Sequence, residues 1–113
     1  MPDEPLQKRR FPRYKTAVAV TVYQCGTVCQ AQIVNISRGG CLIFPPLPPA
    51  ENPELRLSFC LPDGSSYINC KGEVIYSISD KGAGVAFREI SIYNQDRITE
   101  FFEKRLATEK SAG

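Results

Sequence analysis

Residues 16–44 read TAVAVTVYQCGTVCQAQIVNISRGGCLIF, and this stretch indicates the fold. Residues 16–24 alternate between the two faces of a strand, which is the period of a half-buried β-strand. The apolar face of this strand is expected to hold Val18, Val20 and Val22. Gly26 interrupts the alternation, and residues 28–34 have the pattern of a return strand. The sequence therefore predicts an antiparallel hairpin at this point.

Four further short strands are expected downstream, separated by segments rich in Gly, Pro, Asn and Asp. These strands are expected at residues 41–44, 55–61, 67–77 and 84–87. The segments that separate them are Asn35–Gly40, Pro45–Pro49, the Asp63-Gly64 hairpin signal and Asp80–Gly82. Six short strands in a chain of 113 residues fit one small domain, because a closed antiparallel barrel leaves no unpaired strand edge.

The hydrophobic period changes near the C-terminus. Apolar residues recur at helical spacing, namely Ile98, Phe101, Phe102 and Leu106. Asn94 is the expected N-cap, with Asp96 in the first turn, where the helix dipole favours an acid. Tyr93 and Ile98 are expected to form a hydrophobic staple, and residues 109–113 a disordered tail. The predicted fold is mostly all-β: a six-stranded antiparallel barrel with one C-terminal α-helix and a flexible N-terminal arm over residues 1–8.

The excess of positive over negative charge is confined to the N-terminal segment. Residues 1–15 carry five basic and two acidic side chains, so the rest of the chain has nine basic and ten acidic ones. DNA- and RNA-binding proteins usually spread their basic residues over a face, so this distribution argues against a nucleic-acid partner. No run of about 18 apolar residues exists, so membrane insertion is not expected. A basic arm on a near-neutral body suggests a compact anionic partner.

Five cysteines and no histidine exclude several kinds of site. Without His there is no Ser-His-Asp or Cys-His catalytic arrangement and no His-containing metal site. The cysteines lack the paired spacing of zinc sites and are interpreted as small apolar residues on strands. Their odd number, with no apolar leader, indicates reduced thiols and a cytoplasmic location. Neither an enzyme nor a metal or cofactor is expected.

Two short motifs remain. The first is RRFPR over residues 9–13, an R-x₃-R pattern, and the second is NISRGG over residues 35–40, an N-x-S-x-x-G pattern. Guanidinium groups match phosphate oxygens and the O6/N7 edge of guanine, while Asn and Ser can hydrogen-bond a base edge. The glycines allow close approach to the backbone and a positive φ. Taken singly, the motifs also fit a solvated basic tail and an ordinary hairpin turn. Arg38, within the second motif, could reach a phosphate, but it is expected to be an exposed turn residue.

Together, in this order and around one hairpin, the two motifs resemble those of the PilZ domain, the bacterial receptor family for cyclic di-GMP. The segment GVAFREIS over residues 84–91 also resembles the last strand of that family before its C-terminal helix. The resemblance implies a PilZ domain over residues 9–108. It assigns ligand contacts to eight residues: Lys8, Arg9, Arg10, Arg13, Asn35, Ser37, Gly39 and Gly40.

Two departures from the family pattern bear on the ligand. Asn35 stands where Asp is commoner and brings no charge to the guanine N–H groups. Lys8 stands where many members have Arg; a basic residue there often accompanies two bound ligand molecules, and Lys lacks the planar fork of Arg. The ligand stoichiometry, one or two per chain, is therefore left open.

The expected function is that of a cyclic di-GMP receptor. Its arginine arm would order over the ligand and present a changed surface to an unidentified protein, in a process such as motility or biofilm formation. The alternative is a PilZ-like protein-interaction module that binds no nucleotide. A second rival is a small barrel that binds single-stranded nucleic acid through a stacking face, which Phe11 and Tyr14 fit weakly.

Overall fold

The computed structural model describes residues 12–47 and 52–112, with side chains described up to residue 106. Its elements are β1 (Tyr14–Gln24), β2 (Thr27–Ser37), β3 (Gly40–Phe44), β4 (Glu54–Cys60), β5 (Tyr67–Ile78), β6 (Gly82–Glu89) and α2 (Ile92–Ala112). The expected arm over residues 1–8 and the arginines of the first motif before Pro12 lie outside the described residues.

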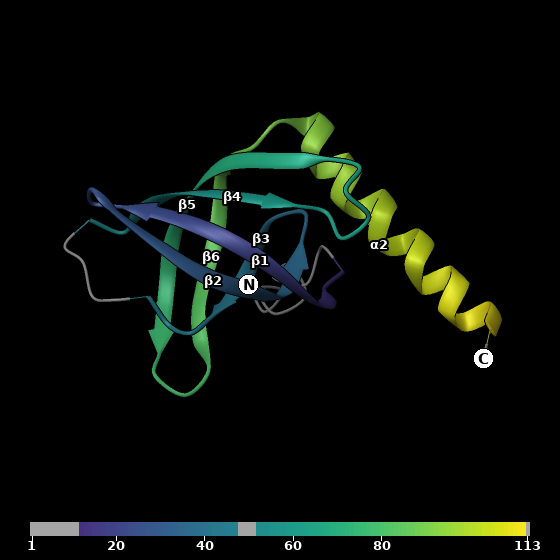
Figure 1. The fold of residues 1–113 in the computed structure, drawn as a ribbon, viewed down its shortest axis with the longest axis horizontal. Coiled ribbons are helices and arrows are strands. Elements are labelled where there is room, and N and C mark those ends of the chain that lie inside the picture. Colours follow the sequence, from purple (N-terminus) through teal and green to yellow (C-terminus); the bar gives the residue numbers. More distant parts are fainter. Residues whose placement is uncertain (1–11, 48–51, 113) are drawn as a thin grey trace, which may run out of the picture.

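The six strands form a closed antiparallel barrel in the order β1-β2-β3-β6-β5-β4, with β4 paired back onto β1. Figure 1 shows the strands wrapped around one core, with α2 against one end and its C-terminal turns projecting beyond the barrel. The predicted fold class is therefore confirmed. Because the barrel is closed, every strand is paired on both sides and no strand edge is left unpaired. Apolar and polar side chains alternate along the strands because one side of each strand faces the core and the other faces outward.

The core is built from the inward side of every strand and one face of the helix. The alternation predicted for the first strand is confirmed, since Val18, Val20 and Val22 are at most 6% exposed. On α2, Ile98 is 0% and Phe102 2% exposed, so the helix covers the barrel with these two side chains. Burying each such side chain stabilises the fold by about 1.5–3 kcal/mol.

The first two strands are longer than the sequence predicts. β1 begins at Tyr14 because Tyr14 pairs with Ile36 and its ring is buried in the core. β2 continues through Ser37, so Asn35 and Ser37 are strand residues, and the turn over 35–40 shrinks to Arg38 and Gly39. β2 is extended by pairing on both sides, with β1 as far as Ile36 and with β3 through Ser37, and turn propensity does not include these strand contacts.

The predicted start of the helix is wrong. The helix begins at Ile92, and the N–H of Asn94 donates to Oγ of Ser91 at 3.0 Å, so Ser91 is the N-cap. Asp96 then lies beyond the first turn, which holds no acid. The staple is wrong too, because Tyr93 is 68% exposed. Ser and Asn are both good N-cap residues. Ser91 caps the helix rather than Asn94 because it is the nearer of the two to the end of β6.

The end of the helix also differs from the prediction. The helix reaches Ala112, so the backbone is helical through most of the segment 109–113 for which a disordered tail was expected. Residues 109–112 contain neither Gly nor Pro, the two residues that end helices most strongly, and Gly113 comes only after them. In the part of the chain that the structure describes, no helix is long and apolar enough to cross a membrane.

The cysteines fit their interpretation only in part. Cys41 and Cys70 are buried and Cys29 is half-buried, whereas Cys25 and Cys60 are exposed. All five are free thiols in this structure. Burial raises the pKa of the Cys70 thiol to about 11 and raises that of Cys41 still further. Both buried thiols are therefore protonated at neutral pH and unreactive.

Candidate ligand-binding face

Strand register brings the described parts of the two motifs together. Tyr14 pairs with Ile36, and Lys15 pairs with Asn35. The Tyr14 and Ile36 side chains are buried in the core, so their neighbours along each strand point outward. Those outward neighbours are Arg13, Lys15, Asn35 and Ser37, which form one polar patch on the outside of β1 and β2.

The predicted ligand contacts differ in how far the structure places them. Arg13 is exposed directly before β1, and Asn35 and Ser37 are half-buried near the end of β2. Gly39 and Gly40 follow at the turn and at the start of β3. Lys8, Arg9 and Arg10 lie outside the described residues, so their part in the site stays a prediction.

Ser37 holds the turn between β2 and β3. Its Oγ accepts a hydrogen bond from the N–H of Gly39 at 3.1 Å and lies 3.5 Å from the carbonyl oxygen of Gly40. The hydroxyl therefore fixes the local backbone and keeps an oxygen lone pair for a further partner. In this respect the Ser37 of the motif is a turn-forming residue as well as a candidate ligand contact.

Gly40 is required by packing. A Cβ atom at this position would lie 2.4 Å from the carbonyl oxygen of Val85 and 3.3 Å from Cα of Ala86, both on β6. The expectation that Gly39 and Gly40 supply a positive φ is wrong, since the glycines with positive φ in the described residues are Gly26, Gly64 and Gly82. Close approach is needed at Gly40, but the group that approaches is the neighbouring strand.

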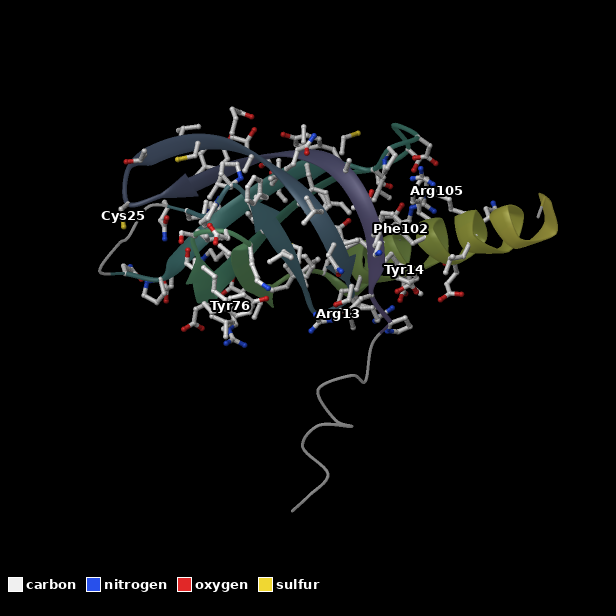
Figure 2. All side chains as sticks on the ribbon, turned by 90° about the horizontal axis from the view of Figure 1, so that it is seen from below. Arg13, Tyr14, Cys25, Tyr76, Phe102 and Arg105 are labelled. Atoms are coloured by element: carbon white, nitrogen blue, oxygen red, sulfur yellow. The ribbon has the colours of Figure 1, made fainter. Side chains whose placement is uncertain are left out.

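The polar patch continues across the sheet to an aromatic side chain. Asn35 pairs with Leu42 on β3, Leu42 with Gly84 on β6, and Gly84 with Tyr76 on β5. The ring of Tyr76 lies over Gly84, because a Cβ added there would be 2.4 Å from Cε2 of that ring. Tyr76 is 46% exposed. Figure 2 shows Arg13 and Tyr76 along the same edge of the barrel.

We call the surface formed by Arg13, Asn35, Ser37, Leu42 and Tyr76 the binding face. It combines a guanidinium, an amide, a hydroxyl and an exposed ring around a glycine position without a side chain. Sequence reasoning missed the contribution of Tyr76. The sequence does contain a tyrosine shortly before the glycine-rich segment 82–84. Only the pairing of β5 with β6 shows that this tyrosine lies over Gly84.

Arg38 lies beside the binding face and contacts the helix. Its Nη1 is 2.9 Å from Oδ1 of Asp96 and donates to Oγ1 of Thr99 at 3.2 Å. In the opposite direction, Nε2 of Gln95 donates to the carbonyl oxygen of Arg38 at 2.9 Å. The Arg38 side chain is 25% exposed, so the expectation of a freely exposed turn arginine is wrong.

Tyr14 attaches the other side of the binding face to the same helix. Its hydroxyl donates to Oε2 of Glu103 at 2.6 Å, and its ring stacks on Phe102 with centroids 5.3 Å apart and planes 11° apart. Burial, followed by the hydrogen bond to Glu103 and the negative charge of that group, raises the pKa of Tyr14 to about 12. Figure 2 shows Tyr14 between Arg13 and Phe102 of α2.

Two cavities lie away from this face. One of about 580 Å³ lies at the β1–β2 turn, and one of about 450 Å³ lies over β4 and β5. They share Tyr23, Arg56, Lys71 and Glu89. Basic and acidic side chains alternate there, with Lys71 3.5 Å from Glu89. Within the described ranges 12–47 and 52–112, no group of three or more His, Cys, Asp or Glu residues could hold a metal ion.

Comparisons with known proteins agree on the fold. The inhibitor of motility MotI/DgrA from Bacillus subtilis has a TM-score of 0.71 at 20% identity, with 88% of this chain and 52% of that chain covered. The present chain thus spans about half the length of that protein. The PilZ domain of CeSA from a cellulose-synthesizing bacterium has a TM-score of 0.65 at 12% identity, with coverages of 82% and 96%. No curated protein matches the sequence.

The family assignment comes from the sequence model of the PilZ domain, which matches residues 7–104 and therefore most of the chain. That span contains both motifs, all six strands and the buried part of α2. PilZ domains are binding and regulatory modules and generally act as receptors for cyclic di-GMP. With the barrel, the helix and the two motifs in place, the chain belongs to the PilZ domain family.

Proposed function

We propose that this chain is a cyclic di-GMP receptor that binds the nucleotide on the binding face and then engages a partner protein. The observation that carries the proposal is the register of β1 and β2. In that register Tyr14 pairs with Ile36, so the exposed Arg13, directly before β1, is adjacent to the strand positions of Asn35 and Ser37, although the two motifs are separated by a whole hairpin. The proposed action is cytoplasmic, as the cysteine content predicts.

The chemistry of the face suits this ligand. Cyclic di-GMP carries two phosphate charges and two guanines. Arg13 can form a bidentate pair with a phosphate or with the O6/N7 edge of a guanine. The amide of Asn35 offers both a donor and an acceptor to a base edge, and the exposed ring of Tyr76 offers a stacking surface. Arg9, Arg10 and Lys8 are proposed to close over the ligand from the arm.

Ordering of the arm is the proposed signal. Fixing a residue of the arm costs about 1–2 kcal/mol, which charge-assisted hydrogen bonds from Arg9 and Arg13 to the phosphates would offset. The covered binding face then differs from the ligand-free one in shape and charge. The proposed partner recognises that difference, and hydrogen exchange should show residues 1–13 gaining protection with ligand.

The test is calorimetric titration of the full chain with cyclic di-GMP. Arg9→Ala and Arg13→Ala are each expected to weaken binding at least tenfold, since a charge-assisted bidentate contact contributes about 1.5–3 kcal/mol. Arg56→Ala is the matched control, because Arg56 is an exposed arginine on β4 that lines the two cavities away from the binding face. Equal losses for Arg13→Ala and Arg56→Ala would refute a specific site, and no heat with the folded unaltered chain would refute the receptor function.

The alternative is a protein-interaction module that needs no nucleotide. It is favoured by exposed apolar residues on β3 and β5, namely Phe44, Ile75, Tyr76 and Ile78. The similar MotI/DgrA is named as an inhibitor of motility, so a component of the motility machinery is a reasonable partner to test. Binding of such a partner with equal affinity in the presence and absence of cyclic di-GMP would favour this alternative.

A further inference from the structure

Helix α2 contacts both sides of the binding face. On one side, Asp96 and Thr99 hold the guanidinium of Arg38, which lies within the second motif. On the other side, Glu103 and Phe102 hold Tyr14, which directly follows Arg13. The helix therefore bridges the segments that carry the two motifs, over less than three of its turns.

The contacts of α2 with Arg38 are of two kinds. Gln95 binds the backbone carbonyl of Arg38 and so fixes the turn itself, whereas Asp96 and Thr99 bind only the guanidinium at the end of the side chain. The Asp96 side chain is 51% exposed, so solvent screens the attraction between Arg38 and Asp96 and the ion pair is weak. The guanidinium can thus change partner while the turn stays seated on the helix.

We propose that Arg38 is a latch for which Asp96 and an anionic ligand compete. In the ligand-free chain, Asp96 holds the guanidinium against α2. A phosphate on the binding face draws the guanidinium to itself, and the first turns of α2 lose the contacts of Asp96 and Thr99 with that guanidinium, while Gln95 stays bonded to the Arg38 carbonyl oxygen. This inference rests on the proposed function, and it names α2 as the element whose state reports occupancy of the face.

The competition has a thermodynamic consequence that can be measured. Coupling between two equilibria is reciprocal, so a ligand that displaces Asp96 must bind more tightly when the Asp96 charge is absent. Asp96→Asn is therefore expected to raise the affinity for cyclic di-GMP about 1.5- to 5-fold, the range given by exposed ion pairs. Arg38→Ala is expected to lower the affinity, and Asp96→Asn should have no effect in the Arg38→Ala background.

Glu100→Gln is the matched control. Glu100 is an exposed carboxylate on the same helix, but its ion pair is with Arg97, with Nη1 and Oε1 3.3 Å apart. The substitution removes the same charge one turn away. If the gain came from a general reduction of negative potential near the phosphates, Glu100→Gln would raise the affinity as much as Asp96→Asn does.

The experiment combines calorimetric titration with hydrogen exchange over residues 92–106, using the four variants and the unaltered chain. Tighter binding by Asp96→Asn alone, together with faster exchange of the first turns of α2 when ligand is added, would support the latch. Binding by the unaltered chain that is unchanged or weakened in Asp96→Asn would overturn the latch while leaving the receptor function intact. Absence of binding by the folded, unaltered chain would overturn both proposals.

Discussion

Gly40→Ala separates packing from ligand contact in the second motif. The new Cβ would lie 2.4 Å from the carbonyl oxygen of Val85 and 3.3 Å from Cα of Ala86, and both atoms belong to the backbone of β6. Neither can rotate away, so β3 and β6 must separate locally, and the hydrogen bond from the N–H of Phe87 to the carbonyl oxygen of Gly39 is the next contact to lengthen. Overpacking of this kind costs about 1–3 kcal/mol.

The assay is reversible thermal unfolding of the ligand-free protein. Using about 2.1 cal/mol/K per residue for the unfolding entropy, that cost lowers the Tm of this chain by about 4–12 °C. Gly64→Ala is the contrasting control: its Cβ meets nothing within 4 Å, although its φ of +76° adds a conformational cost of about 1 kcal/mol. A Gly40→Ala protein with unchanged Tm but weakened ligand binding would refute the packing explanation and return Gly40 to a ligand role.

Three further predictions follow from single contacts. Tyr14→Phe removes the hydrogen bond to Glu103 and should lower stability by about 1–2 kcal/mol in a denaturant titration. Because the folded-state pKa of Tyr14 is raised, its contribution is complete below pH 10 and is lost as the pH rises toward 12; Tyr14→Phe should lack this component of alkaline destabilisation. Ser91→Ala removes the N-cap of α2 and should cost about 1 kcal/mol, with the exposed Ser79→Ala as control. Asn35→Asp should tighten cyclic di-GMP binding about fivefold in a titration if Asn35 faces guanine N–H groups, since a charged acceptor strengthens such bonds by about 1 kcal/mol.

The barrel was predictable because its signals are local. Alternation placed Val18, Val20 and Val22 on the core side of one strand, and turn residues separated the strands. The start of the helix was not predictable, since Ser91 and Asn94 are both good caps and only the end of β6 decides between them. The length of β2 was not predictable for a similar reason, because β2 pairs with β1 as far as Ile36 and with β3 through Ser37.

The residues of the candidate site likewise differ in whether a local sequence signal identifies them. The motifs identify Arg13, Asn35 and Ser37 without any structure, because each supplies a functional group at a recognisable spacing. Tyr76 and Arg38 depend on register and on helix placement. Tyr76 lies over Gly84 only through the pairing of β5 with β6, and Arg38 meets Asp96 only after α2 has folded back onto the barrel. Neither contact is indicated by a motif of fixed spacing in the sequence.

Motif residues can therefore be sorted by comparing stability with affinity. Arg13 is exposed before β1, and exposed substitutions of this kind usually change stability by less than about 0.5 kcal/mol. An affinity loss in Arg13→Ala with unchanged Tm thus measures a ligand contact. Gly40 can be altered only by moving β6, so any affinity loss there follows a loss of stability. Ser37 is intermediate between Arg13 and Gly40, because its hydroxyl accepts a hydrogen bond from the N–H of Gly39 and is also on the outward side of β2. Ser37→Ala should therefore lower both quantities, and a fall in affinity without a fall in Tm would show that the turn holds without this hydroxyl.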